Sequence, residues 1–307
     1  MALYTSISIC SGVGMLDHAI DIATNGSNGT VLYVEREAFA VANLAWQMES
    51  GFLSPAPVWS DVKSLISMEV IEYVDRCLSE QVLDFLYGGI PCQPWSVAGK
   101  QDGADDERDL WPATLAAIGK YKPGIVFIEN VPGILNQPMG GERIVRDLGA
   151  NGYRVTAGLF SSEEMGASHA RERVFIMGHH EDKHKNDGIE YGRKITDRGT
   201  GTKLADCYPE GLAIGDSFGT NAIKKFETVE RAGGELGHYT PGRNQYDEWE
   251  RVAQLEPSRM PCVESEFRRV ADGVARRIDR IRAVGNGVDP LVAAYEFVTL
   301  SACLLGE

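Results

Sequence analysis

Short apolar runs alternate with segments of helical periodicity along the first 180 residues of the chain. An apolar run bounded by turn residues predicts a strand, and an apolar position at every third or fourth residue predicts a helix. The predicted strands are 4–9, 30–35, 56–61, 83–89, 124–130, 154–160 and 173–180, and the predicted helices are 15–23, 37–48, 66–79, 110–121 and 141–152. This alternation predicts an α/β fold with a mainly parallel sheet.

The pattern changes after His180. Residues 181–260 mix glycine, polar and charged residues with scattered aromatics, which favours a small folded module over a linker. Helical periodicity then returns, and Asp289 and Pro290 are typical of a helix N-cap and first turn. The strongly apolar helix after them is expected to pack on the sheet. The sequence thus predicts two domains, residues 1–180 with 265–307 and residues 181–264.

Composition narrows the class of protein. The chain has 307 residues, 43% of them hydrophobic, so it can bury a sizeable core. Its net charge of −14 argues mildly against a polyanionic partner, although Arg268–Arg282 forms one local basic stripe. The six cysteines form no C-x-x-C pair, so we expect reduced thiols, with neither a metal site nor a disulfide framework. No signal peptide or membrane span is expected, which favours a cytoplasmic protein.

Ligand-type residues follow the first three predicted strands. Gly12 and Gly14 make a tight turn between strand and helix, while Glu35 and Asp61 end the next two strands. The dinucleotide fingerprint is incomplete because Asp17 stands where a third small residue belongs. A plain turn and two capping acids are the alternative reading. Since all three strand ends meet at one sheet edge, a site for a ribose and an adenine is favoured.

Cys92 lies between Pro91 and Pro94, directly after a predicted strand. The prolines stiffen the turn, and the polar, glycine-containing residues that follow suit a lid. Most cysteines are buried apolar residues, but one presented on a stiff turn is a candidate nucleophile.

Charged residues also flank two later strands. Glu129 ends the apolar run 124–130, where burial would raise its pKa and let it hold a proton; a capping acid is the alternative. Arg171 and Arg173 stand two apart in an extended segment, so they face the same way as a fork for phosphate or a base edge. A solvated strand start is the alternative for this pair.

These motifs together resemble the DNA (cytosine-5) methyltransferases. The matching blocks are CSGVGMLDHA, YVEREAF, SDV, GGIPCQPWSVAGKQ, IENVPGIL, ARERVF and AVGNGV, which cover roughly residues 3–180 and 267–303. The closing RRVADGVARRIDRIRAVGNG is similar to phage or prophage members. Three departures are Cys10 in place of phenylalanine, His169 in place of glutamine, and Gly287 in place of serine or alanine.

The resemblance implies a role for each matched residue. Cys92 attacks C6 of cytosine, Glu129 holds N3, Arg173 contacts the O2 edge, and Arg171 supports Arg173 or a phosphate. The residues implied for S-adenosyl-L-methionine are Cys10, Gly12, Val13, Gly14, Glu35, Arg36, Asp61, Val62, Pro91, Leu110 and Asn286. Gln93 and Ser96 are expected on the loop that closes over DNA. Arg243 and Asn244 are candidate base readers, because Arg suits guanine and Asn suits adenine.

The resemblance further implies a Rossmann-like methyltransferase sheet with a target-recognition domain at 181–264. The expected activity is methylation of C5 of a flipped-out cytosine in double-stranded DNA. The protein is expected to be a monomer, and whether it has a cognate restriction endonuclease as a partner is left open. The alternatives are the same chemistry on RNA, a DNA-binding protein with a dead site, and a thiol oxidoreductase that uses Cys92. The last lacks a nearby resolving cysteine and gives Glu129 no role.

Overall fold

The computed structural model describes residues 4–79, 81–91, 109–136, 140–162, 171–180, 251, 254–255 and 287–305. Within these residues one sheet has the strand order β3-β2-β1-β4-β5-β7-β6. The strands are β1 Tyr4–Ile9, β2 Asn28–Val34, β3 Val58–Trp59, β4 Phe85–Gly89, β5 Ile125–Asn130, β6 Tyr153–Ser161 and β7 Glu172–His180. All pairs are parallel except those of β7, which runs antiparallel to both β5 and β6. The prediction of a mainly parallel α/β sheet is therefore confirmed.

The helices are α1 Met15–Ala23, α2 Ala38–Glu49, α3 Met68–Leu78, α4 Trp111–Tyr121, α5 Gly141–Ala150 and α9 Pro290–Leu305, and two 3-10 turns are η1 Val62–Ser64 and η4 Pro132–Asn136. The bounds agree with the predicted ranges to within two residues. The third strand is two residues shorter than predicted at each end, so it pairs over two residues where six were predicted. It lies at the edge of the sheet, and Asp61 then starts the turn η1 by accepting the backbone N–H of Lys63.

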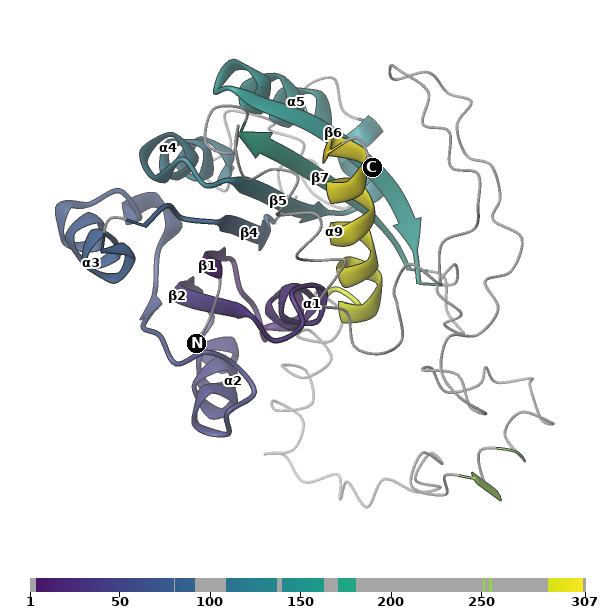
Figure 1. The fold of residues 1–307 in the computed structure, drawn as a ribbon, viewed down its shortest axis with the longest axis horizontal. Helices are drawn as coiled ribbons and strands as arrows, with labels where there is room; N and C mark the ends of the chain where they lie inside the picture. The colour runs from purple at the N-terminus through teal and green to yellow at the C-terminus, as the bar shows by residue number, and fades with distance from the viewer. Residues whose placement is uncertain are drawn as a thin grey trace, which may run out of the picture.

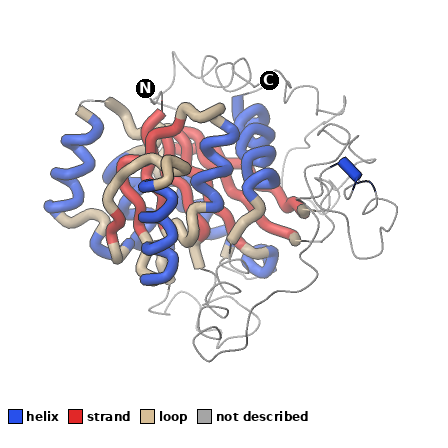
Figure 2. Tube along the Cα trace, turned by 90° about the horizontal axis from the view of Figure 1, so that it is seen from below, coloured by secondary structure: helices blue, strands red, loops and turns tan. Residues whose placement is uncertain are grey.

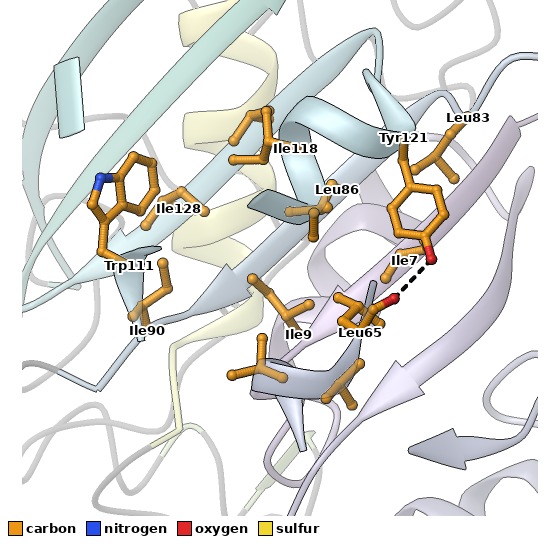
Figure 3. Close-up of a cluster of buried hydrophobic side chains, with 14 of the residues drawn as sticks. Ile7, Ile9, Leu65, Leu83, Leu86, Ile90, Trp111, Ile118, Tyr121 and Ile128 are labelled. Carbon is orange, nitrogen blue, oxygen red and sulfur yellow. Dashed lines mark hydrogen bonds between the residues drawn. The ribbon is translucent and has the colours of Figure 1, made fainter. Parts of the chain in front are cut away.

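Two hydrophobic layers cover the sheet. On one face, α3, α4 and α5 bury a cluster that includes Ile7, Ile9 and Leu86 (Figures 1 and 3). In this cluster the hydroxyl of Tyr121 donates to the carbonyl of Leu65 at 2.9 Å. On the other face, α1 and α9 bury a second cluster that includes Phe85 and Phe127. Figure 2 shows the helices arranged around the strands. Successive strand residues thus alternate between the two layers.

The C-terminal helix α9 packs on α1, β6 and β7 (Figure 1). Its Phe297 meets Phe85 and Phe127 edge-on, with ring centroids 5.4 and 5.2 Å apart. Asp289 caps the helix by accepting the backbone N–H of Leu291 at 3.1 Å, as predicted. Residues 287–305 therefore complete the sheet's second layer. The proposed domain at 181–264 stays a prediction, because almost all of it lies outside the described residues.

Among the residues that the structure describes, no helix is both long and apolar enough to cross a membrane.

Candidate active site

The carboxyl ends of the parallel strands β1, β2, β3, β4 and β5 meet at one edge of the sheet. The strand order reverses between β1 and β4, and ligands of open α/β sheets bind at such a switch point. The turn 10–14 follows β1, and Pro91 follows β4 with one residue between. The site is built at the point that the topology favours.

The turn after β1 is open on one side and closed on the other. Gly12 has φ +56°, and a Cβ added there would meet no atom within 4 Å. Gly14 has φ +79°, and its Cβ would lie 2.9 Å from Leu53 Cδ1. Gly14 therefore packs tightly on its surroundings, whereas the backbone at Gly12 can be approached closely.

Glu35 joins this turn to the start of α2. One carboxylate oxygen accepts the backbone N–H of Gly12 at 2.8 Å. The other accepts the N–H groups of Arg36 and Glu37, both at 2.7 Å. The carboxylate thus lies beside the open face of Gly12, as a ribose ligand would require, while the side chain of Arg36 is exposed.

A buried amide that the sequence reading missed supports the same turn. Gln47 of α2 donates from Nε2 to the carbonyl of Val13 at 2.9 Å and to Asn43 Oδ1 at 2.6 Å. Its Oε1 then accepts from His18 Nε2, 2.6 Å away. The signal in the sequence was a polar residue on the apolar side of a helix, three positions after the buried Leu44.

The remaining residues predicted for the cofactor have different surroundings. Asp61 is exposed and caps η1, whereas Val62 is buried in the core. Leu110 precedes α4 and packs on the core, and Pro91 is exposed. Burial and Glu35 raise the pKa of Cys10 to about 12, so this thiol stays protonated at neutral pH. The surroundings of these five residues do not test their cofactor roles, which stay predictions.

Asp17, which breaks the dinucleotide fingerprint, is a buried acid. Its Oδ1 accepts from the hydroxyl of Tyr87 at 3.0 Å, and Oδ2 has no hydrogen-bond partner among the described residues. Tyr87 in turn lies within hydrogen-bond distance of Thr30 and Ser6. Burial raises the pKa of Asp17 to about 6. The acid therefore belongs to a polar network beneath the glycine turn and is no cofactor ligand at its surface.

Glu129 stands near the end of β5, opposite Gly89 of β4. A Cβ at Gly89 would lie 2.9 Å from Glu129 Oε2, so glycine leaves room for the carboxyl group. Arg173 of β7 brings its Nε to 2.7 Å from Glu129 Oε1, and both side chains are largely buried. Burial raises the pKa of Glu129, although Arg173 and Arg171 act in the opposite direction. Glu129 is thus buried, as the sequence suggested, and its role as a proton-holding acid stays a prediction.

Two polar contacts hold together segments that lie near this acid. Asn130 donates from Nδ2 to the carbonyl of Ile90 at 3.1 Å, which fixes the chain just before Pro91. Arg171 donates from Nη2 to the carbonyl of Gly287, which joins β7 to the start of α9. The predicted pair of arginines lies beside Glu129, but the two side chains have different partners.

Several predicted residues lie outside the described part of the chain: Cys92, Gln93, Ser96, His169, Arg243, Asn244 and Asn286. Their roles stay predictions.

The strand order and the groups at the carboxyl edge define a Rossmann-like methyltransferase sheet. A family model, C-5 cytosine-specific DNA methylase, matches residues 4–282. The chain therefore belongs to the C-5 cytosine-specific DNA methylase family, whose members depend on S-adenosylmethionine.

Individual relatives agree with this assignment. The chain is 40% identical over 97 residues to Type II methyltransferase M.AplI of Arthrospira platensis, which covers 31% of this chain and 28% of the relative. It is also 30% identical over 176 residues to Type II methyltransferase M.NgoMIV of Neisseria gonorrhoeae. That match covers 57% of this chain and 51% of the relative. The matches thus span about half or less of these curated relatives. The crystal structure of S. pombe Dnmt2 methyltransferase shares the fold, with a TM-score of 0.53 and 16% sequence identity. The match covers 98% of this chain and 99% of that chain.

Proposed function

We propose that this protein transfers a methyl group from S-adenosylmethionine to C5 of a cytosine in double-stranded DNA, through covalent addition of Cys92 to C6. The observation that carries the proposal is the buried pair Glu129–Arg173 opposite Gly89. Cys92 follows Gly89 by three residues, a chain length of at most about 11 Å. That span supports a thiol and an acid on two sides of one pyrimidine.

Each group has a role that its chemistry supports. C5 of cytosine is a poor nucleophile, and adding a thiolate to C6 converts the ring into an enamine that is nucleophilic at C5. The addition places charge on N3, where a hydrogen bond from Glu129 would lower the barrier. Burial raises the pKa of Glu129, which favours the protonated form that this bond needs, while Arg173 and Arg171 act in the opposite direction. Arg173, paired with Glu129, is suited to the adjacent O2. C5 then forms a bond to the methyl carbon while the bond from that carbon to the donor's sulfonium sulfur breaks. Loss of the C5 proton and release of the Cys92 thiolate from C6 then restore the ring.

The described cofactor residues fit the methyl donor. The backbone at Gly12 is open to close approach, and the carboxylate of Glu35 lies beside it. S-adenosylmethionine supplies an electrophilic methyl group on a cationic sulfur, which suits a pocket lined by acids. In this proposal Gly12, Glu35 and Asp61 hold the nucleoside part.

C5 of a stacked base cannot be reached inside a duplex, so the cytosine must be flipped out. We assign target recognition to residues 181–264, with Arg243 and Asn244 as candidate base readers. The cognate restriction endonuclease, the monomeric state, and the cytoplasmic location in a bacterial host with a possible phage origin stay predictions from the sequence.

The proposal is tested by expressing the protein in a host without cytosine methylation and mapping 5-methylcytosine across the genome. We expect methylation at one short sequence, its loss in Cys92→Ala, and a strong reduction in Glu129→Gln. Methylation of structured RNA in place of duplex DNA would favour the RNA alternative. Methylation that persists in Cys92→Ala would contradict the covalent mechanism.

A further inference from the structure

Four charged side chains connect the sheet to the start of α9. Arg173 of β7 pairs with Glu129 of β5 at 2.7 Å. Arg171, directly before β7, donates to the carbonyl of Gly287. Two residues further along the chain, Asp289 is the N-cap of α9. The charges thus follow one another as acid, arginine, arginine and acid, and we call Glu129, Arg173, Arg171 and Asp289 the β5–α9 charge row.

The β5–α9 charge row lies on the face of the sheet that α9 covers. Glu129 stands opposite Phe175 in the register of β5 and β7, and Phe175 packs in the cluster beneath α1 and α9. Arg173 is two positions from Phe175 in the same strand, so its side chain is on the same face. Figure 1 shows α9 lying over β6 and β7. The contact of Arg171 with Gly287 then places the start of α9 beside the two arginines.

Asp289 offsets surroundings that are otherwise unfavourable for Arg171. The two guanidinium groups are neighbours, and the N-terminus of a helix carries partial positive charge. Burial and Arg173 lower the pKa of Arg171, whereas Glu129 and Asp289 raise it. A guanidinium in such surroundings is stabilised by a carboxylate partner. Asp289 supplies a carboxylate at the start of α9, so Arg171 does not need Glu129 as its partner.

We propose that Asp289 is a positioning residue for methyl transfer, whose charge keeps the Arg171 guanidinium at the start of α9 so that Glu129 pairs with Arg173 alone. The inference rests on the proposed function, in which the protonated Glu129 makes the hydrogen bond to N3. A second guanidinium at Glu129 would favour the ionised carboxylate. Asp289 therefore acts on Glu129 through Arg171, and this action is separate from its role as a helix cap.

The test separates the charge of Asp289 from its cap. Asp289→Asn removes the charge and keeps a good N-cap, whereas Asp289→Glu keeps the charge and weakens the cap. Infrared difference spectroscopy of the full-length protein follows the carboxyl band that Glu129→Gln removes, so Glu129 is titrated without any turnover. We expect the midpoint of this titration to move to lower pH in Asp289→Asn and to stay close to wild type in Asp289→Glu. Asp75→Asn, at an exposed acid of α3, is the matched control and should titrate as wild type.

A second set of variants removes Arg171. In Arg171→Met the midpoint should move to higher pH, because Arg171 is one of the two cations that favour the ionised form of Glu129. Adding Asp289→Asn to Arg171→Met should change the midpoint no further, since Asp289 acts through Arg171. Methyl transfer should agree with the titration. On the alkaline side of the wild-type midpoint, kcat of Asp289→Asn should fall about tenfold, with the KM for S-adenosylmethionine within about twofold of wild type.

A midpoint that Asp289→Asn leaves unchanged, or shifts equally with and without Arg171, would overturn the inference. A larger shift in Asp289→Glu than in Asp289→Asn would assign Asp289 a capping role alone and overturn it too. A wild type that shows the expected titrations but transfers no methyl group would instead contradict the proposed function, so the two failures are distinguishable.

Discussion

Asp17 should make the stability of this protein depend on pH in a direction opposite to that of most acids. Its pKa is about 6 in the folded chain, against 3.8 for an ordinary aspartate, because burial outweighs its hydrogen bonds. The folded state therefore binds the proton more tightly than the unfolded state. The stabilisation is fully present below pH 3.8 and is lost as pH rises through about 6.

The size of the effect follows from the shift. A difference of about two pKa units corresponds to about 3 kcal/mol, and about 2 kcal/mol of that should be lost between roughly pH 4.5 and 7.5. Asp17→Asn removes the titration but keeps the acceptor for Tyr87. The amide also adds a donor where Oδ2 has no partner among the described residues, which gives an offset independent of pH.

The assay is urea unfolding followed by circular dichroism at several pH values, with Glu69→Gln as the control. Glu69 is an exposed acid in the first turn of α3. The stability of Asp17→Asn relative to wild type should rise by about 2 kcal/mol over this pH range, and that of Glu69→Gln should not. A difference between Asp17→Asn and wild type that is constant with pH would refute the reasoning.

Two further substitutions test the surroundings of the acid and of the glycine turn. Gly89→Ala should lower kcat at least about tenfold, because the added Cβ would lie 2.9 Å from Glu129 Oε2 and displace the carboxyl group. The control is Gly149→Ala, whose added Cβ would have no atom within 4 Å. Equal activity of the two variants would contradict this account. Gln47→Leu should raise the KM for S-adenosylmethionine about fivefold, since, of the three bonds of Gln47, the one to the Val13 carbonyl supports the glycine turn and is worth about 1 kcal/mol; an unchanged KM would show that Val13 needs no such support.

The strands and helices were predictable because their periodicity is local. The run 4–9 and the helix 15–23 appear with the predicted bounds. The third strand was overpredicted, because pairing at a sheet edge depends on a neighbour rather than on composition. The order of the strands, with β7 antiparallel between β5 and β6, depends on contacts between distant segments and could not be derived from periodicity.

The candidate site was predictable to a similar degree. Glu129 and the arginine pair could be found because strand ends and spacing place them. Their individual partners could not, since the Glu129–Arg173 pair and the Arg171–Gly287 contact join residues 44 and 116 positions apart. Gln47 was missed for the same reason, because it acts through contacts with Val13 and His18 that no local sequence motif indicates.

The central claim is that Cys92 bonds to C6 of a cytosine while Glu129 holds N3. The most direct test is a duplex with 5-fluorocytosine at the mapped target position, incubated with S-adenosylmethionine and analysed by mass spectrometry. Fluorine cannot leave C5 as the proton does, so the account predicts a stable adduct between Cys92 and the methylated base. Glu129→Gln should form this adduct more slowly, and Cys92→Ala should form none. A wild-type enzyme that methylates ordinary cytosine at this position yet forms no adduct at Cys92 would contradict the account.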